Sequence, residues 1–224
     1  MKEDNRPQLW VLGGPNASGK RKLLDIAERE KDFPTTYINA DNIQEEYGFS
    51  REETTAFVNA EYEEHLKNRN SFAFETVLSH PSKTDMMKRV KDMGYKVVLF
   101  FICTQNVEIN HARTIKREQE TGQYAVPLND LTRYYTRSMD MVSNAVPLAD
   151  YAKIYNNSWE DPKLIAEKRE DGDIKLYPLK DKDPRSSWDR NALENLLGLK
   201  KNIPGVKTSP DLMDILKSRM GSLR

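Results

Sequence analysis

The sequence contains a single cysteine among its 224 residues and has no long apolar run. One thiol cannot form an internal disulfide, and Cys103 ends an apolar stretch, so it is predicted to be a small buried side chain rather than a nucleophile. The longest apolar run, residues 97–103, is far shorter than the ~20 residues that cross a bilayer. The first residues mix acidic with basic side chains, so no signal peptide is predicted. We therefore expect a cytoplasmic protein without a membrane span.

The sequence also lacks an excess of charge of either sign. It has 35 Lys+Arg and 35 Asp+Glu, a formal net charge of zero, so it lacks the overall basic character that duplex nucleic-acid binding needs. Charged residues make up 31% of the chain and hydrophobic residues only 38%. The three histidines, His65, His80 and His111, are far apart and show no metal-ligand spacing. These features predict a globule with a polar surface and one substantial domain.

Predicted strands and helices alternate through the first two thirds of the chain. The expected strands are 8–13, 35–40, 71–77, 95–103 and 151–155, and the expected helices are 20–31, 52–69, 81–93, 107–120 and 128–142. Asp41 and Gln44 are spaced as a capping box for a further short helix. The unbroken hydrophobicity of 95–103 is typical of a strand that is covered on both faces. The alternation predicts a mainly parallel sheet in a three-layer α/β fold with right-handed crossovers.

The composition changes after Asn157, where mixed charge replaces the alternating pattern. We therefore predict a core over residues 1–157 and an extension over 158–224 that packs on it as a small α/β appendage. A strand is expected at 173–179 and a helix at 187–197. Residues 200–224 carry a local excess of four positive charges, which is interpreted as a solvated face rather than a binding arm.

A glycine-rich segment follows the first predicted strand and opens the first predicted helix. Its residues fit the pattern glycine, four residues, glycine, lysine. In such a loop, successive backbone N–H groups surround phosphate oxygens, the helix N-terminus favours negative charge, and the lysine reaches the outer phosphates. The strand before it and the helix after it supply the required context. The sequence thus predicts an ATP or GTP site formed by Gly14, Pro15, Asn16, Ala17, Ser18, Gly19, Lys20 and Arg21.

Arg21 departs from the pattern, which places Ser or Thr after the lysine as a magnesium ligand. A guanidinium group has no free lone pair and stays protonated, so Arg21 cannot bind a metal. Three interpretations remain open. Arg21 points outward and Mg²⁺ is held by phosphates, waters and a carboxylate, or its charge partly substitutes for the ion, or phosphoryl transfer has been weakened or lost.

Three polar residues are predicted at the ends of the second and third strands, where ligands of open α/β sheets bind. Asp41 is a candidate for accepting the proton of an acceptor hydroxyl and for holding Mg²⁺. Glu75 and Thr76 end the third strand and are candidate acceptor contacts. Asp41 is equally suited to cap a helix, and Glu75 to form a strand-end ion pair, and both alternatives stay open.

Arginines recur at helical spacing in the two predicted helices that follow the fourth strand. Arg113 and Arg117 are one turn apart, as are Arg133 and Arg137. Arginines on a mobile lid can stabilise the charge of a transferring phosphoryl group and exclude water. Gly122, between the helices, is a candidate hinge. The alternative is a solvated basic face paired with neighbouring glutamates.

An ordered set of segments resembles the zeta toxin family, in the branch described as ABC-type ATPases. The set comprises the loop GGPNASGK, the strand end NAD at residues 39–41, the segment FAFETVLSHPSK at 72–83, the strand YKVVLFFICT at 95–104 and the later arginines. The resemblance covers about residues 8–157. It implies a P-loop kinase fold with a helical lid region.

The resemblance also implies an activity. Members of the family transfer the γ-phosphate of ATP to a hydroxyl of UDP-N-acetylglucosamine or related nucleotide sugars, poison cell-wall synthesis and are often neutralised by an antitoxin. It makes Lys20 the phosphate lysine and Asp41 the catalytic base. Glu75 and Thr76 become sugar-nucleotide contacts. Arg113, Arg117 and Arg133, in that order of preference, become the charge stabilisers.

Three hypotheses follow from the sequence. The first is an ATP- and Mg²⁺-dependent small-molecule kinase that acts on a nucleotide sugar, with an antitoxin as a partner. The second, motivated by Arg21, is a nucleotide-binding regulator with little chemistry. The third is a nucleic-acid end kinase, against which the near-neutral charge argues.

Overall fold

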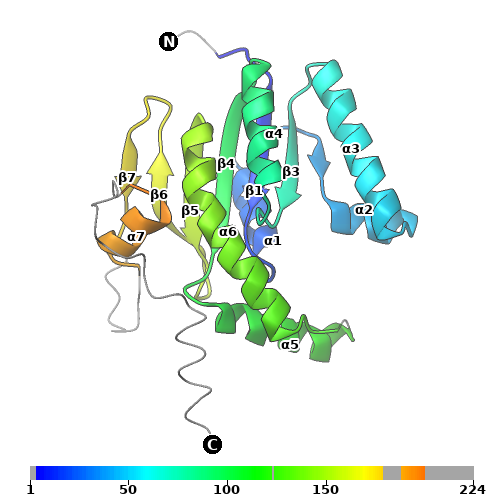
Figure 1. Ribbon diagram of the computed structural model, residues 1–224, viewed down its shortest axis with the longest axis vertical. Helices are drawn as coiled ribbons and strands as arrows, with labels where there is room; N and C mark the ends of the chain where they lie inside the picture. The colour runs from blue at the N-terminus through cyan, green and yellow to red at the C-terminus, as the bar shows by residue number, and fades with distance from the viewer. Residues whose placement is uncertain (1–3, 123, 179–187, 200–224) are drawn as a thin grey trace, which may run out of the picture.

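The computed structural model describes residues 4–122, 124–178 and 188–199 and shows a single seven-stranded sheet in the order β2-β3-β1-β4-β5-β6-β7 (Figure 1). The first five strands are parallel, β6 runs antiparallel to β5, and β7 runs antiparallel to β6. This order brings the first strand to the centre, between the third and the fourth. The strands are β1 Gln8–Gly13, β2 Tyr37–Ile38, β3 Phe72–Thr76, β4 Lys96–Cys103, β5 Tyr151–Asn156, β6 Lys163–Lys168 and β7 Ile174–Leu176.

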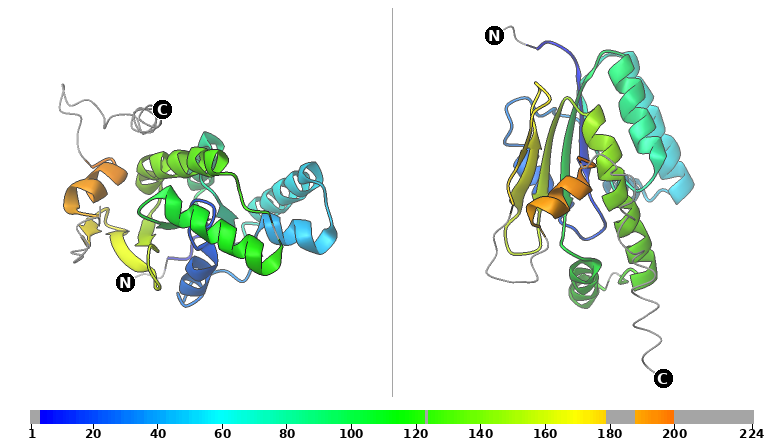
Figure 2. Two further views of the ribbon diagram at one scale, coloured as in Figure 1. Left: turned by 90° about the horizontal axis from the view of Figure 1, so that it is seen from below. Right: turned by 60° about the vertical axis from the view of Figure 1, so that its left-hand side comes forward.

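Helices cover the two faces of the sheet unequally (Figure 2). The face that carries α3, α4, α6 and α7 has the larger apolar core, and α1 packs on the opposite face. Helix α5 and the first half of α6 project beyond the lower end of the sheet in Figure 1. The helices are α1 Lys20–Ala27, α2 Ala40–Tyr47, α3 Arg51–Lys67, α4 Pro81–Asp92, α5 Val107–Thr121, α6 Leu128–Leu148 and α7 Arg190–Leu196.

The central strands are apolar on both sides because successive side chains enter different cores. In β4, Leu99 and Phe101 join the core under α4 and α6, whereas Phe100 and Ile102 pack toward α1. All eight residues of β4 are buried, as its continuous hydrophobicity predicts. Cys103 is among them, and burial raises the pKa of its thiol, which agrees with a structural role. The three-layer α/β fold with a mainly parallel sheet is thus confirmed.

Several element boundaries differ from the sequence prediction. The second strand comprises only Tyr37–Ile38, because it lies at the edge of the sheet and pairs with a single neighbour, β3. Helix α1 ends at Ala27, and α6 continues past the predicted end at 142 to Leu148, with Pro147 in its last turn. Lys168 compensates for the weakened helix end, because its ammonium group donates to the carbonyl groups of residues 146, 147 and 149.

The sheet continues across residue 157. Strand β6 was not predicted, because its sequence has mixed charge. It pairs antiparallel with β5, and β7 pairs antiparallel with β6. The predicted strand at 173–179 corresponds to β7, and the predicted helix at 187–197 corresponds to α7, whose Leu193 is buried in the larger core. The basic segment 200–224 lies outside the described residues. The division into domains at residue 157 stays a prediction.

Candidate nucleotide-binding site

The loop between β1 and α1 needs glycine at two positions. A side chain on Gly14 would collide with the carbonyl oxygen of Ile102 in β4, which is backbone and cannot move aside. Gly19 has φ 106°, in the left-handed region, and caps α1. Ala17 also has a positive φ, 58°, which costs free energy for a residue with a Cβ. The tight curl of the loop is therefore imposed by its surroundings as well as by its own sequence.

Three successive carbonyl groups of this loop are held by side chains of other elements. Asn110 of α5 donates from Nδ2 to the Asn16 oxygen at 2.6 Å. Arg113 of α5 donates to the oxygens of Ala17 and Ser18 at 3.3 and 3.4 Å. Asn157, just after β5, donates from Nδ2 to the Ser18 oxygen at 2.8 Å. We call Asn110, Arg113 and Asn157 the loop clamp, because it binds carbonyl groups of the loop. Two N–H groups of the loop, those of Gly14 and Ser18, donate to the carbonyl oxygens of Thr76 and Pro15.

The loop clamp is itself anchored to the sheet. Arg113 donates through Nη2 to the backbone oxygen of Asn157 at 2.6 Å, which connects α5 with the end of β5. The Thr104 hydroxyl, just after β4, bonds the Asn110 amide oxygen, and Tyr135 of α6 donates to the Thr104 carbonyl at 2.7 Å. Helix α5 is therefore attached directly to the phosphate loop, and α6 is attached to it through Thr104 and Asn110.

Lys20 is the first residue of α1, and its side chain is only 12% exposed. Its ammonium nitrogen lies 3.4 Å from the Pro15 oxygen and 3.7 Å from Glu75 Oε1. Burial lowers the pKa of Lys20, while the charges of Glu75 and Asp41 act to raise it and Arg117 acts to lower it. The structure thus places Lys20 beside Glu75, and the charges of Asp41 and Arg117 act on the same ammonium group.

Glu75 and Thr76 end β3 as predicted. The second carboxylate oxygen of Glu75 accepts a hydrogen bond of 2.7 Å from Tyr37, and the Tyr37 oxygen in turn accepts from Asn39 Nδ2 at 3.2 Å. The Thr76 carbonyl accepts from the Gly14 N–H at 3.2 Å, which attaches β3 to the phosphate loop. We call Tyr37, Asn39, Asp41, Glu75 and Thr76 the acceptor side.

The predicted position of Asp41 requires a correction. Asp41 does not end the second strand and does not cap a helix with Gln44. Asn39 is the N-cap of α2, and its Oδ1 accepts from the N–H groups of Asp41 and Asn42 at 2.8 and 3.2 Å. Asparagine is as good a cap as aspartate, so the side chain of Asp41 is left exposed in the first turn.

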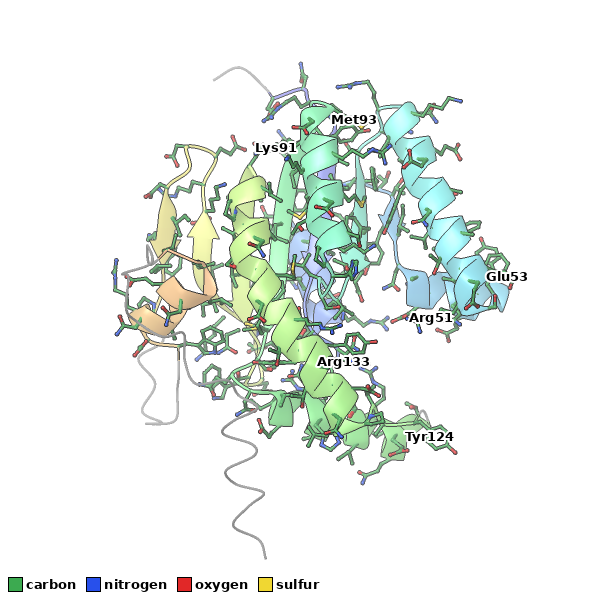
Figure 3. The ribbon with its side chains drawn as sticks, in the orientation of Figure 1. Arg51, Glu53, Lys91, Met93, Tyr124 and Arg133 are labelled. Carbon is green, nitrogen blue, oxygen red and sulfur yellow. The ribbon has the colours of Figure 1, made fainter. Side chains whose placement is uncertain are left out.

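The predicted arginines occupy different environments. Arg113 contacts loop carbonyls, and burial lowers its pKa. Arg117, one turn further along α5, is exposed but acts electrostatically on Lys20. Arg133 lies on the outer side of α6 (Figure 3), where it pairs with Asp130 at 2.9 Å and stacks on the Tyr134 ring. Its role as a charge stabiliser stays a prediction.

The residues of the loop fit a phosphate group but do not supply the usual magnesium ligand. Ser18 Oγ is buried and has no hydrogen-bond partner among the described residues, so the curled loop retains an unused polar group. Arg21 is exposed and has no hydrogen bond or ion pair within residues 4–122, 124–178 and 188–199. The same residues contain no cluster of three side chains that could bind a metal ion. Asp41 as a metal ligand stays a prediction.

Sequence reasoning missed four residues that organise this site, namely Asn110, Asn157, Tyr37 and Asn39. Asn110 lies three residues before Arg113, on the same helix face, which was the one local signal available. Asn157 stands at the boundary where the composition changes. The hydrogen-bond partners of these residues either lie far away in the sequence or are set by the orientation of the side chain, so sequence spacing could not reveal them.

The topology and the loop define a class of protein. A central parallel strand that leads through a glycine-rich loop and a buried lysine into a helix is the P-loop nucleoside triphosphatase fold. The sequence model described as Zeta toxin matches residues 1–178, and the chain belongs to the zeta toxin family. The match extends past the predicted 8–157 and includes β6 and β7. No protein with a curated function matches the chain.

Solved structures with low sequence identity share the fold. A chain of the AvrRxo1-ORF1:AvrRxo1-ORF2 complex with sulphate ions has a TM-score of 0.61 at 16% identity, covering 96% of this chain and 72% of that one. A chain of the PezAT toxin-antitoxin system of Streptococcus pneumoniae has a TM-score of 0.56 at 17% identity, covering 99% and 88%. In another crystal of the AvrRxo1-ORF1:-ORF2 complex, this chain spans 61% of the matched chain.

Proposed function

We propose that this protein is an ATP-dependent kinase that phosphorylates a hydroxyl group of a small molecule, with a nucleotide sugar such as UDP-N-acetylglucosamine as the acceptor. One observation carries the proposal. A nearly buried lysine at the start of α1 lies 3.7 Å from a carboxylate at the end of the adjacent strand β3, so a phosphate-binding group and an acceptor-binding group meet at one edge of the sheet.

The residues of the phosphate loop, the acceptor side and α5 have different roles in the proposed reaction. Lys20 and the N–H groups of the phosphate loop other than those of Gly14 and Ser18 bind the phosphates of ATP, while the loop clamp holds the loop carbonyls. Asp41 accepts the proton of the acceptor hydroxyl, and its exposed position in the first turn of α2 leaves it accessible to that group. Arg117 is an exposed cation on α5, one turn beyond the loop-clamp residue Arg113, and in this proposal it stabilises charge on the transferred group.

The experiment is a panel of acceptors incubated with purified protein and ATP and analysed by mass spectrometry. UDP-N-acetylglucosamine, other nucleotide sugars, nucleosides, free sugars and oligonucleotides are tested with and without Mg²⁺. A mass increase of one phosphoryl group on a nucleotide sugar, absent with Lys20→Ala, supports the proposal. Phosphate on oligonucleotide ends alone would favour a nucleic-acid end kinase, and no transfer to any acceptor would contradict both.

A second candidate function, a nucleotide-binding regulator with weak or lost catalysis, is favoured by one observation. Arg21 is exposed and has no partner among the described residues, and it stands where magnesium-dependent members of this fold class place a hydroxyl. This candidate predicts ATP binding that is independent of Mg²⁺, without turnover. Arg21→Ser is then expected to gain magnesium dependence and activity, as measured by calorimetry and by the acceptor panel. If the wild type already requires Mg²⁺ for binding, the second candidate fails.

The proposed partner is an antitoxin protein. The AvrRxo1-ORF1:AvrRxo1-ORF2 and PezAT structures are described as complexes or toxin-antitoxin systems, and this chain shares their fold. A small protein encoded next to this one that copurifies with it and inhibits the panel reaction would support this partner. Within the described residues no helix is long and apolar enough to cross a membrane. Cytoplasmic localisation stays a prediction.

A further inference from the structure

The acceptor side contains a continuous chain of hydrogen bonds that sequence motifs do not assign to any function. It begins at Asn39, passes through the Tyr37 hydroxyl, and reaches Glu75, whose other oxygen faces Lys20. The two hydrogen bonds are 2.7 and 3.2 Å long, and the ion pair between Glu75 and Lys20 is 3.7 Å. It connects the phosphate lysine with the residue that caps the helix of Asp41.

We propose that Tyr37 is a positioning residue that holds Glu75 against Lys20 and, through Asn39, sets the position of Asp41 relative to the phosphate loop. This inference rests on the proposed kinase function for its kinetic consequence. Its structural part, the connection of Tyr37 to Glu75 and to the start of α2, stands independently of any acceptor.

The direction of each hydrogen bond in this chain is fixed by chemistry. The Glu75 carboxylate can only accept, so the Tyr37 hydroxyl donates to it and has its oxygen free to accept. Asn39 therefore presents Nδ2 to Tyr37, which leaves Oδ1 for the N–H groups of Asp41 and Asn42. Reversing the amide of Asn39 would place donor against donor at the helix start. Both the Tyr37 phenol and the Asn39 amide thus donate and accept, and the phenol joins the amide to the carboxylate.

The position of Tyr37 explains why this connection is needed. Strand β2 has two residues, pairs with β3 alone and forms the edge of the sheet, so backbone hydrogen bonds hold the start of α2 weakly. Helix α2 has no fully buried residue. The hydroxyl of Tyr37 supplies the link that the short strand does not. Burial and the charge of Glu75 raise the pKa of Tyr37, so the phenol stays a donor through the neutral range.

The test is Tyr37→Phe, which removes the hydroxyl and keeps the ring. Backbone amide hydrogen exchange at Asp41 and Asn42 reports the structural link, and it needs no acceptor. Phosphoryl transfer from ATP to UDP-N-acetylglucosamine reports the kinetic consequence. We expect faster exchange at both amides and a fall in kcat of about tenfold, the equivalent of one lost hydrogen bond to a charged group, with the Kd of ATP changed less than about threefold.

Tyr95→Phe is the matched control. Tyr95 is fully buried, whereas Tyr37 is half-buried, and the Tyr95 hydroxyl donates to the carbonyl oxygens of His65 and Asn70, outside the phosphate loop and the acceptor side. We expect this variant to lose thermal stability without changing exchange at Asp41 and Asn42 or the ratio of kcat to KM. A merely structural Tyr37 would behave in the same way as Tyr95.

The outcomes separate the inference from the proposed function. Unchanged amide exchange at Asp41 and Asn42 in Tyr37→Phe overturns the positioning role, whatever the kinetics. Faster exchange together with a wild type that transfers no phosphate to UDP-N-acetylglucosamine supports the structural link and contradicts that acceptor. Faster exchange with an unchanged kcat overturns the kinetic part alone. In a Glu75→Gln background, Tyr37→Phe is expected to cost less activity than in the wild type, because the interaction with the carboxylate is already lost and only the link to Asn39 remains to be removed.

Discussion

The phosphate loop and the acceptor side of the same site are held in place by different means. The loop clamp contributes side chains from α5 and the end of β5 to three successive loop carbonyls. The acceptor side depends on a two-residue edge strand and on one chain of hydrogen bonds. A firmly held phosphate loop suits a cosubstrate that is always the same. An acceptor side with fewer fixed contacts can move as an acceptor binds.

This comparison predicts that substitutions on the two sides have different effects on nucleotide binding, stability and turnover. On the phosphate side, nucleotide binding and folding stability should change together, because the loop is packed against several elements. On the acceptor side, turnover should fall while binding of ATP and stability remain. Substitutions of single residues on each side can separate these effects.

Lys20→Met should have the largest effect. It removes the buried ammonium group and keeps the length and the apolar part of the side chain, so ATP loses its interaction with the loop lysine. We expect ATP affinity to fall at least about hundredfold, the equivalent of a lost buried charge pair with phosphate, and transfer to become undetectable. Isothermal titration calorimetry measures the first and mass spectrometry the second. Lys22→Met, an exposed neighbour on α1, is the control and should bind ATP normally.

Asp41→Asn should abolish turnover without weakening ATP binding. The exposed carboxylate is the proposed proton acceptor, and losing such a group costs roughly 10²–10⁴ in rate. The melting temperature should stay close to that of the wild type, since Asn39 still caps α2. The measurements are kcat with the identified acceptor, the Kd of ATP and thermal unfolding. A parallel loss of ATP affinity would show that the two sides are not separable.

Arg113→Met should weaken the phosphate side through the backbone. The substitution removes the guanidinium donor from the oxygens of Ala17, Ser18 and Asn157, and of these Ser18 keeps its hydrogen bond from Asn157 Nδ2. We expect the free energy of unfolding to fall by roughly 1–3 kcal/mol and ATP affinity to fall by about tenfold. Chemical denaturation and calorimetry measure the two effects. Lys116→Met on the same helix, where the lysine forms only an exposed ion pair with Glu120, should leave both unchanged.

The pH dependence of stability should show the burial of Lys20. Its pKa in the folded state lies below the ordinary 10.5, so between the two values the unfolded chain binds more protons than the folded one. The free energy of unfolding contributed by this group therefore rises as the pH increases through that window. Denaturation of wild type and Lys20→Met at a series of alkaline pH values should show the steeper rise in the wild type. Equal slopes would contradict a desolvated lysine.

The central strands and the phosphate loop could be predicted because their signals are local. The apolar run of β4 and the glycine-lysine pattern before α1 each specify a structure without reference to distant residues. The predicted strand 8–13 coincides with β1, and Glu75 and Thr76 end β3 as expected. Asp41 was misplaced because two residues, Asn39 and Asp41, both had good capping side chains, and the choice depended on where β2 stops pairing with β3.

The sequence by itself determined the fold class, the phosphate loop and the carboxylate at the end of β3, since periodicity and short motifs depend on neighbours in the chain. Only the tertiary structure decided that Arg113 holds loop carbonyls, that Asn157 reaches Ser18, and that Tyr37 connects Glu75 with Asn39. These contacts join residues up to 139 positions apart. Such pairs are set by strand order and side-chain direction, which no local pattern encodes.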